Sequence, residues 1–238
     1  MTIAAALMGL LTGFLAWIGQ SVLSEHITEN GDEAEISWKG FLLDAKKSGL
    51  TGIWSRHGRK DWPVLILFML AGAFLTRGAW LRFSLSPGYL ISLVLIITLL
   101  FLSGVDFRRQ VIPDALNLVV FLCGLTYNLL YRTSSPLQML AGLGIAGGFL
   151  FILALLGGMG GGDIKLMAAA GVLLGPYRVV LALFLGFLAG SLVSLVLIAL
   201  KKKGRKDMIA FGPYLSLGVI LSFLFYEEIL RWYLSLLV

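Results

Sequence analysis

Residues 85–105 read LSPGYLISLVLIITLLFLSGV, a stretch of 21 residues without a formal charge. A helix needs about 20 such residues to cross roughly 30 Å of bilayer hydrocarbon. Comparable apolar stretches cover residues 2–23, 62–81, 115–131, 137–158 and 179–200. Two further apolar segments cover residues 164–174 and 209–230. The first of them is too short to cross the bilayer alone. The sequence therefore predicts an all-α, polytopic membrane protein with about eight transmembrane helices.

The composition of the whole chain points to the same class. Of its 238 residues, 58% are hydrophobic and 13% are charged, and the mean hydropathy is +0.92. Soluble domains average about 25% charged residues, so this chain has too few to cover a water-facing surface. The one cysteine, Cys123, excludes an intrachain disulfide framework. We expect residues 1–238 to form a single membrane domain.

The cations are distributed unevenly between the loops. With about eight alternating crossings, residues 24–61, 106–114, 159–165 and 201–207 share one side of the membrane. That side carries 14 of the 19 Lys and Arg residues: Lys39, Lys46, Lys47, Arg56, Arg59, Lys60, Arg108, Arg109, Lys165, Lys201, Lys202, Lys203, Arg205 and Lys206. The positive-inside rule makes this side cytoplasmic and places both termini outside. The net charge of +6 thus indicates topology and contact with lipid headgroups, and nucleic acid binding loses its support.

The polar stretch at residues 24–61 lies between the first two predicted helices. Its 38 residues have room for a hairpin or a short helix, but not for an independent core. We expect a cytoplasmic loop subregion here. The preceding segment, residues 2–23, lacks the basic start and the cleavage site of a signal peptide, so we expect it to remain as a helix.

Glycine is frequent in this chain, at 29 of 238 residues. Two pairs at helical spacing, Gly144 with Gly148 and Gly186 with Gly190, predict close helix packing. The run GGMGGGD at residues 157–163 is different, because five glycines in six residues disfavour a regular helix. Non-helical backbone at membrane depth must be buried in protein or line a watery cavity. We therefore expect a polar helix break that ends in a carboxylate.

Three aspartates, Asp106, Asp114 and Asp163, fall at the cytoplasmic ends of predicted helices. Asp114 precedes an apolar helix, so an N-cap role explains it. Asp106 stands at the C-terminal end of its helix, where the helix dipole disfavours an anion. Two carboxyls in one site do not both ionise cheaply, so one keeps its proton while the other activates water. We favour an aspartyl dyad of Asp106 and Asp163; the alternative is a cation- or proton-coupled transporter that uses all three.

Other polar residues have simpler interpretations. Glu227 and Glu228, near the outer end of the last segment, are expected to reach headgroups or Arg231. The glycine run is not a phosphate-binding P-loop, because no Ser or Thr follows Lys165. The two histidines lack ligand spacing, so no metal site is predicted.

These motifs resemble those of the type IV prepilin peptidases, which are intramembrane aspartyl proteases of the GxGD type. Residues 160–166, GGGDIKL, are similar to the family's GGGDxKL form. Residues 106–114, DFRRQVIPD, are similar to its first-aspartate segment, in which Pro-Asp follows the aspartate. Residues 211–214, FGPY, are similar to the motif that opens its last helix, and residues 9–14 to part of its first helix. The resemblance covers most of the chain in the right order.

The resemblance implies an endopeptidase that removes the short basic leader from type IV prepilins or pseudopilins. The reaction would take place at the cytoplasmic face of the cell inner membrane and would need no cofactor. By this resemblance Asp106 and Asp163 are the catalytic pair. We expect the substrate to be bound near them by Gly160, Gly161, Gly162, Lys165 and Asp114.

The sequence departs from the family pattern in the first cytoplasmic loop. Many bacterial members carry two CxxC pairs there, a zinc site, and also methylate the new N-terminus with S-adenosylmethionine. Residues 24–61 contain no cysteine, so no zinc is expected in this loop. Cleavage does not depend on that feature in the resemblance, whereas methylation stays an open alternative.

Overall fold

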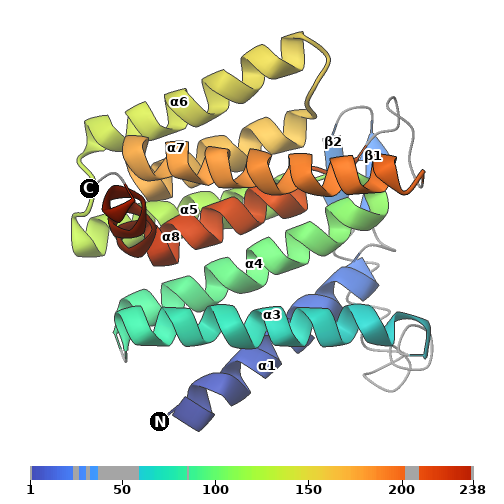
Figure 1. The fold of residues 1–238 in the computed structure, drawn as a ribbon, viewed down its shortest axis with the longest axis horizontal. Coiled ribbons are helices and arrows are strands. Elements are labelled where there is room, and N and C mark those ends of the chain that lie inside the picture. The colour runs from blue at the N-terminus through green and yellow to red at the C-terminus, as the bar shows by residue number, and fades with distance from the viewer. Residues whose placement is uncertain are drawn as a thin grey trace. The chain divides into compact units, whose positions relative to one another are not determined.

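The structure, a computed structural model, describes residues 2–23, 27–30, 33–36, 59–84, 86–201 and 209–236. Its helices are α1 (Thr2–Leu23), α3 (Arg59–Phe83), α4 (Pro87–Arg109), α5 (Asp114–Tyr131), α6 (Pro136–Leu155), α7 (Gly161–Ala199) and α8 (Gly212–Ser235) (Figure 1). Strands β1 (Ile27–Asn30) and β2 (Glu33–Ile36) form an antiparallel hairpin. Most of the loop at residues 24–61 and the basic segment 202–208 lie outside the described residues.

The chain divides into two compact units, residues 1–123 and 124–238, with the boundary inside α5. Among the described residues, six helices are long and apolar enough to cross a membrane, and residues 7–21 form a shorter apolar helix. The predicted all-α membrane fold is thereby confirmed, with a small hairpin in the first loop. The prediction of a single domain over residues 1–238 stays a prediction.

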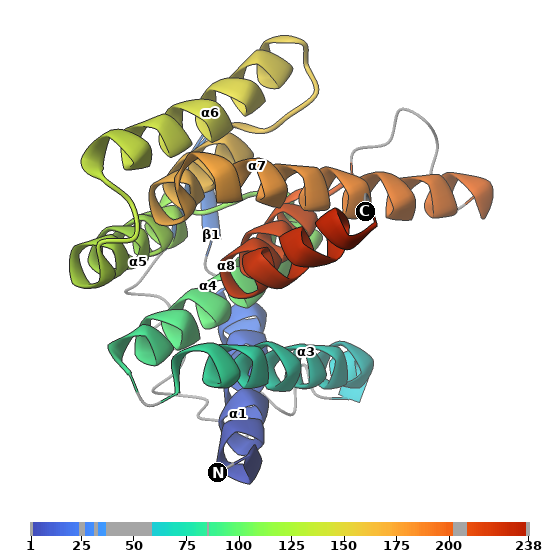
Figure 2. The same cartoon turned by 60° about the vertical axis from the view of Figure 1, so that its left-hand side comes forward.

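In the first unit, small residues let α1 cross α3 at close range (Figure 2). A Cβ added to Gly72 of α3 would lie 2.7 Å from the backbone nitrogen of Gly13 and would also meet the carbonyl oxygen of Gly9. Beside this crossing, the buried hydroxyls of Thr12 and Thr76 are hydrogen-bonded at 3.2 Å. Backbone proximity and a polar pair therefore join these helices, as is common where lipid removes the hydrophobic drive for helix association.

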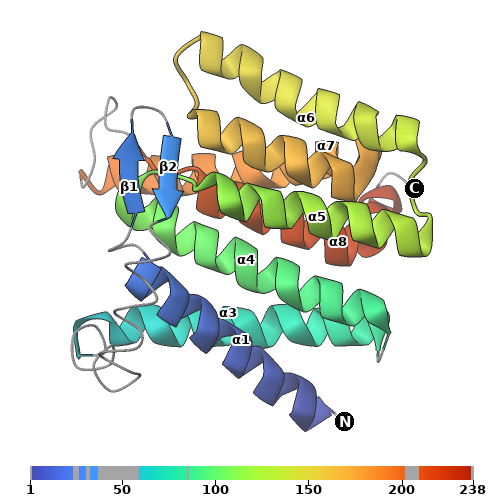
Figure 3. The same cartoon turned by 180° about the vertical axis from the view of Figure 1, so that it is seen from behind.

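In the second unit, α6 lies antiparallel to the first half of α7 (Figure 3). Gly142 and Gly171 meet backbone against backbone, with no room for a Cβ on either residue. The predicted packing of Gly144 and Gly148 is wrong, because both are exposed and a Cβ on either would meet nothing within 4 Å. A helix turns about 200° over two residues, so Gly144 faces away from the contact that Gly142 makes.

The second half of α7 packs on α8 through the other predicted glycine pair. A Cβ on Gly186 would lie 3.2 Å from the Cα of Leu215, and Gly190 lies against the ring of Phe211. The same ring is 5.0 Å from that of Phe187. This glycine pair is confirmed as a packing site, and the Phe211 motif anchors the start of α8 on α7.

The two halves of α7 run in opposite directions. Gly175 has φ 69° and ψ −176°, a region open essentially to glycine alone. On α6, Gly147 lies beside Ala168, whereas the ring of Phe149 is 5.8 Å from that of Phe187. Ala168, before Gly175, and Phe187, after it, therefore contact the same turn of α6, as a reversal of the chain at Gly175 requires. Counted as two helices, α7 brings the number of helices in the described part of the chain into line with the prediction of about eight.

Asn128 of α5 caps the first half of α7 at this reversal. Pro176 has no N–H for the carbonyl of Val172, and the reversal also frees the carbonyl of Leu173. The Nδ2 of Asn128 donates to these oxygens at 2.8 and 3.3 Å and to the Gly124 carbonyl at 3.0 Å. Its Oδ1 accepts a hydrogen bond from Thr133 at 2.6 Å. A short helix, about 21 Å for its 14 residues, thus ends inside the unit with its carbonyls satisfied.

The contrast between Gly142 and Gly144 gives a test of the helix packing. We expect Gly142→Ala to lower the free energy of unfolding by about 1–3 kcal/mol, because its Cβ overlaps α7. Gly144→Ala is expected to raise it by up to about 1 kcal/mol, because alanine is the better helix former. Thermal unfolding of the detergent-solubilised protein measures both. Equal effects of the two substitutions would contradict this packing.

Candidate functional site

Asp106 lies in the last turn of α4, as the sequence predicts. The helix ends at Arg109, and Gln110 adopts a left-handed conformation, φ 57°, from which its N–H donates to the carbonyl of Asp106 at 2.8 Å. The Asp106 residue is 5% exposed. The C-terminal dipole disfavours a carboxylate here, so helix stability does not explain this residue.

A buried glutamine of α1 braces the same turn of α4. Gln20 is 1% exposed, and its side chain fills the space that a Cβ at Gly104 would need. With its Oε1 turned toward α4, Gln20 accepts hydrogen bonds from the guanidinium of Arg108, at 3.3 Å from Nη2 and also from Nε. Arg108 follows Asp106 by two residues, so α1 holds the turn that carries the aspartate. Gln20 is not among the residues predicted from the sequence, where its signal is a single amide side chain in an apolar helix.

Asp114 begins α5 directly after a four-residue link from α4. It is exposed, and a negative side chain in the first helical turn is favoured by the helix dipole. The helix continues for one turn to Asn117, which is 6% exposed. In the described part of the chain, neither amide atom of Asn117 has a hydrogen-bond partner.

The glycine run breaks the chain between α6 and α7. Residues 156–160 lie between the helices, Gly157 has φ 77°, and Gly160 is the N-cap residue of α7. The expected break is thus present, but it is shorter than predicted, because Gly161 and Gly162 form the first turn of α7. The N–H groups of a first turn lack intrahelical partners in any case, so glycine disturbs a helix less there than in its interior.

Asp163 is the third residue of α7 and is half-buried. Its carboxylate turns back toward the break, since a Cβ at Gly160 would lie 3.5 Å from Oδ2. A Cβ at Gly161 would meet nothing within 4 Å, so the backbone beside the carboxylate is approachable. Lys165 is exposed on the same turn. The helix dipole favours an anion at this end, opposite to its effect on Asp106.

The predicted site residues thus form two local groups. Asp106 and Asp114 flank the link between α4 and α5 in the first unit, and residues 160–165 form the start of α7 in the second. Each group is described within its own unit, so the pairing of Asp106 with Asp163 stays a prediction. Among the described residues, no three His, Cys, Asp or Glu side chains are grouped so that they could hold a metal ion.

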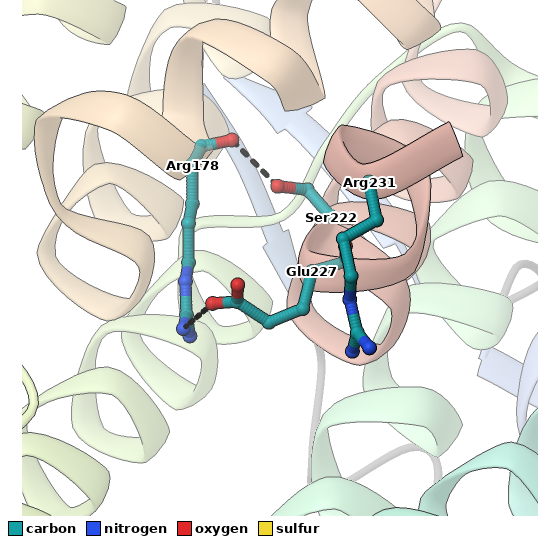
Figure 4. A network of polar contacts seen from close by, with 4 residues as sticks. All are labelled: Arg178, Ser222, Glu227 and Arg231. Atoms are coloured by element: carbon teal, nitrogen blue, oxygen red, sulfur yellow. Dashed lines mark hydrogen bonds and ion pairs between the residues drawn. The ribbon is translucent and has the colours of Figure 1, made fainter. Parts of the chain in front are cut away.

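A separate polar network ties α7 to α8 near the reversal (Figure 4). The Nη2 of Arg178 lies 3.3 Å from a carboxylate oxygen of Glu227, and Ser222 Oγ donates to the Arg178 carbonyl at 2.6 Å. Arg231, the expected partner of Glu227, donates from Nε to its backbone carbonyl at 3.3 Å instead. The carboxylate therefore stabilises helix packing, since Arg178 approaches it from the neighbouring helix.

A cavity of about 610 Å³ lies at the turn between α5 and α6, where Arg132, Ser134 and Gln138 contribute to its lining. A smaller one of about 120 Å³ shares Ser134 and Gln138 and reaches Arg178. Both lie at the end of the α6–α7 hairpin opposite Asp163, and their lining residues include no carboxylate.

These features define a multi-pass helical membrane protein with one aspartate buried at a helix end and another after a glycine break. Residues 93–195, a range that includes both, match the Type IV leader peptidase family. A prepilin leader peptidase/N-methyltransferase of Bacillus subtilis (strain 168) is 32% identical over 173 residues, covering 70% of this chain and 68% of the relative. The chain belongs to the type IV leader peptidase family.

Relatives with the same name occur in Aeromonas. That of Aeromonas salmonicida (strain A449) is 35% identical over 163 residues, or 64% of this chain, and that of Aeromonas hydrophila is 34% identical over the same length. The matched region spans 55% and 56% of these relatives, little more than half of their length. No solved structure matches the chain.

The contact between Gln20 and Arg108 can be tested by substitution. We expect Gln20→Leu to lower the free energy of unfolding by about 1 kcal/mol, because the hydrogen bonds from the guanidinium to the Gln20 amide oxygen are lost. Gln20→Glu keeps an acceptor beside Arg108 and should lose less stability at neutral pH. Thermal unfolding in detergent compares the two variants, and a Gln20→Leu protein as stable as the original would show that the contact does not brace α4.

Proposed function

We propose that this chain is an intramembrane aspartyl endopeptidase that removes the short basic leader from type IV prepilins or pseudopilins. The observation that carries the proposal is the family match over residues 93–195, which contains both Asp106 and Asp163. The names of the Bacillus and Aeromonas relatives support the same activity. They give no support to the alternative of a transporter.

In the proposed reaction, Asp106 and Asp163 hold one water between them, one ionised and one protonated. The water oxygen attacks the scissile carbonyl carbon while the ionised carboxylate takes a proton from the water. The other carboxyl group protonates the carbonyl oxygen at the same time. The resulting diol collapses with cleavage of the C–N bond, and the proton taken from the water passes to the leaving nitrogen. The products are a leader with a free carboxyl group and a pilin with a free amine.

The substrate would enter at the start of α7. Gly160, Gly161 and Gly162 present a backbone without side chains, and the space beside Gly161 supports a close approach of an extended peptide. Lys165 would position the carboxylate or the substrate from the exposed side of the same turn. Exposed Asp114 would attract the basic residues of the leader.

The proposed location is the cell inner membrane, with the aspartates at its cytoplasmic face and both termini outside. The distribution of cations supports this side, since 14 of the 19 Lys and Arg residues fall in the loops assigned to it. A prepilin could then leave its basic leader in the cytoplasm while its apolar helix stays in lipid. The cleavage site would come to the depth of the two aspartates.

Methylation is a separate question, because the relatives are also named N-methyltransferases. S-adenosylmethionine would have to reach the new N-terminus beside the aspartates. The two cavities described above do not fit this role, because they lie at the opposite end of the α6–α7 hairpin from Asp163 and lack a carboxylate for a ribose. Neither of these two cavities therefore supports a methylation step.

The two aspartates give the direct test of the protease. We expect Asp106→Asn and Asp163→Asn each to reduce cleavage of a tagged Bacillus subtilis prepilin at least about 100-fold, because general acid–base catalysis is lost. Asp114→Asn is the matched control and should retain turnover with weaker binding. Proteoliposome assays read by gel shift and mass spectrometry measure this. Normal cleavage by both variants would refute the assignment, and loss with Asp114→Asn alone would identify a different partner.

A further inference from the structure

Asn117 of α5 has a buried amide that the described part of the chain leaves unused. The residue is 6% exposed, and neither Nδ2 nor Oδ1 has a hydrogen-bond partner within that part. Buried amides in folded proteins are almost always satisfied, because burying an unpaired polar group is costly.

The same helix contains a control for this observation. Asn128 is 4% exposed, as deeply buried as Asn117, yet its amide donates to three carbonyls and accepts from Thr133. The two asparagines are 11 residues apart, which places them about 20° apart on one face of α5. One therefore supports the fold by capping α7, whereas the other has the same chemistry without a structural use.

The position of Asn117 relates it to the proposed cleavage site. It lies three residues after Asp114, so both occupy neighbouring positions on the first turn of α5. The link that precedes this turn comes directly from the end of α4, which carries Asp106. The amide thus lies about one helical turn along α5 from Asp114.

An amide side chain is complementary to a peptide group, since each offers an N–H donor and a carbonyl acceptor. Cleavage requires the substrate backbone to leave its helix and become extended around the scissile bond. Its N–H and C=O groups then need partners from the protein, because hydrocarbon offers none. A buried amide without an internal partner is suited to supply them.

We propose that the Asn117 side chain binds the extended backbone of the peptide substrate next to the cleavage site. This inference rests on the proposed protease function and adds a binding residue that lies outside both sequence motifs. Asn117 does not take part in proton transfer. Its loss should therefore weaken substrate binding while the aspartates remain able to cleave.

The decisive variant is Asn117→Leu, which keeps the approximate size and removes the amide. In proteoliposomes with tagged Bacillus subtilis prepilin, we expect KM to rise about tenfold, as for a lost hydrogen bond to a buried group. The midpoint of thermal unfolding should stay the same or rise, because no internal hydrogen bond is lost. The matched control is Asn128→Leu, which should lower the midpoint of thermal unfolding. Measured at a temperature at which this variant is folded, its KM should be unchanged.

Asn117→Asp provides a second measurement, since it preserves the shape, keeps an acceptor and removes the donors. It should also raise KM. An unchanged KM in Asn117→Leu would overturn the inference, and so would a fall in its unfolding midpoint like that of Asn128→Leu. If both Asn117 variants fail to fold, the residue is structural and the inference is likewise wrong.

The assay separates this inference from the proposed function. If the original chain does not cleave the prepilin, the protease proposal fails, and the inference fails with it. If the original chain cleaves, Asp106→Asn does not, and Asn117→Leu cleaves with an unchanged KM, only the inference fails.

Discussion

The capping of α7 by Asn128 is the interaction on which the second unit depends. In hydrocarbon a helix can stop only where another group takes over its free carbonyls. Asn128 does so for Val172 and Leu173, at the point where Gly175 reverses the chain. The first half of α7 is consequently a short helix held between α6 and a cap. Its other end can carry the glycine break and Asp163.

The two aspartates have contrasting relations to their helices. Asp163 stands in a first turn, where the helix dipole stabilises a negative charge. Asp106 stands in a last turn and is almost fully buried, and the dipole there disfavours an anion. An aspartyl protease needs one carboxylate and one carboxylic acid at the start of its reaction. In the proposed protease, the two helix ends would place the carboxyl groups in opposite dipole fields.

The sequence predicts the elements well because span length and hydrophobicity decide them in a membrane. The reading of residues 164–174 as a separate short helix agrees with the reversal at Gly175. Packing faces were harder to predict, since spacing alone does not distinguish the exposed Gly144 from the buried Gly142. The roles of Gln20, Asn117 and Asn128 depend on groups that are distant in the sequence. The local pattern of residues around each one does not reveal those contacts.

The central claim is that Asp106 and Asp163 share one site, and cross-linking measures it directly. Cys123 is the sole native cysteine, so a Cys123→Ser background isolates the pair Asp106→Cys and Asp163→Cys. Mild oxidation in membranes should join the two cysteines directly, because disulfides require Cα atoms within about 7 Å. If a water-sized gap separates the thiols, a short bifunctional thiol cross-linker should join them instead. Asp106→Cys with Arg132→Cys is the control and should not cross-link. Absence of a cross-link in the first pair, with both thiols reactive, would contradict a shared aspartyl site.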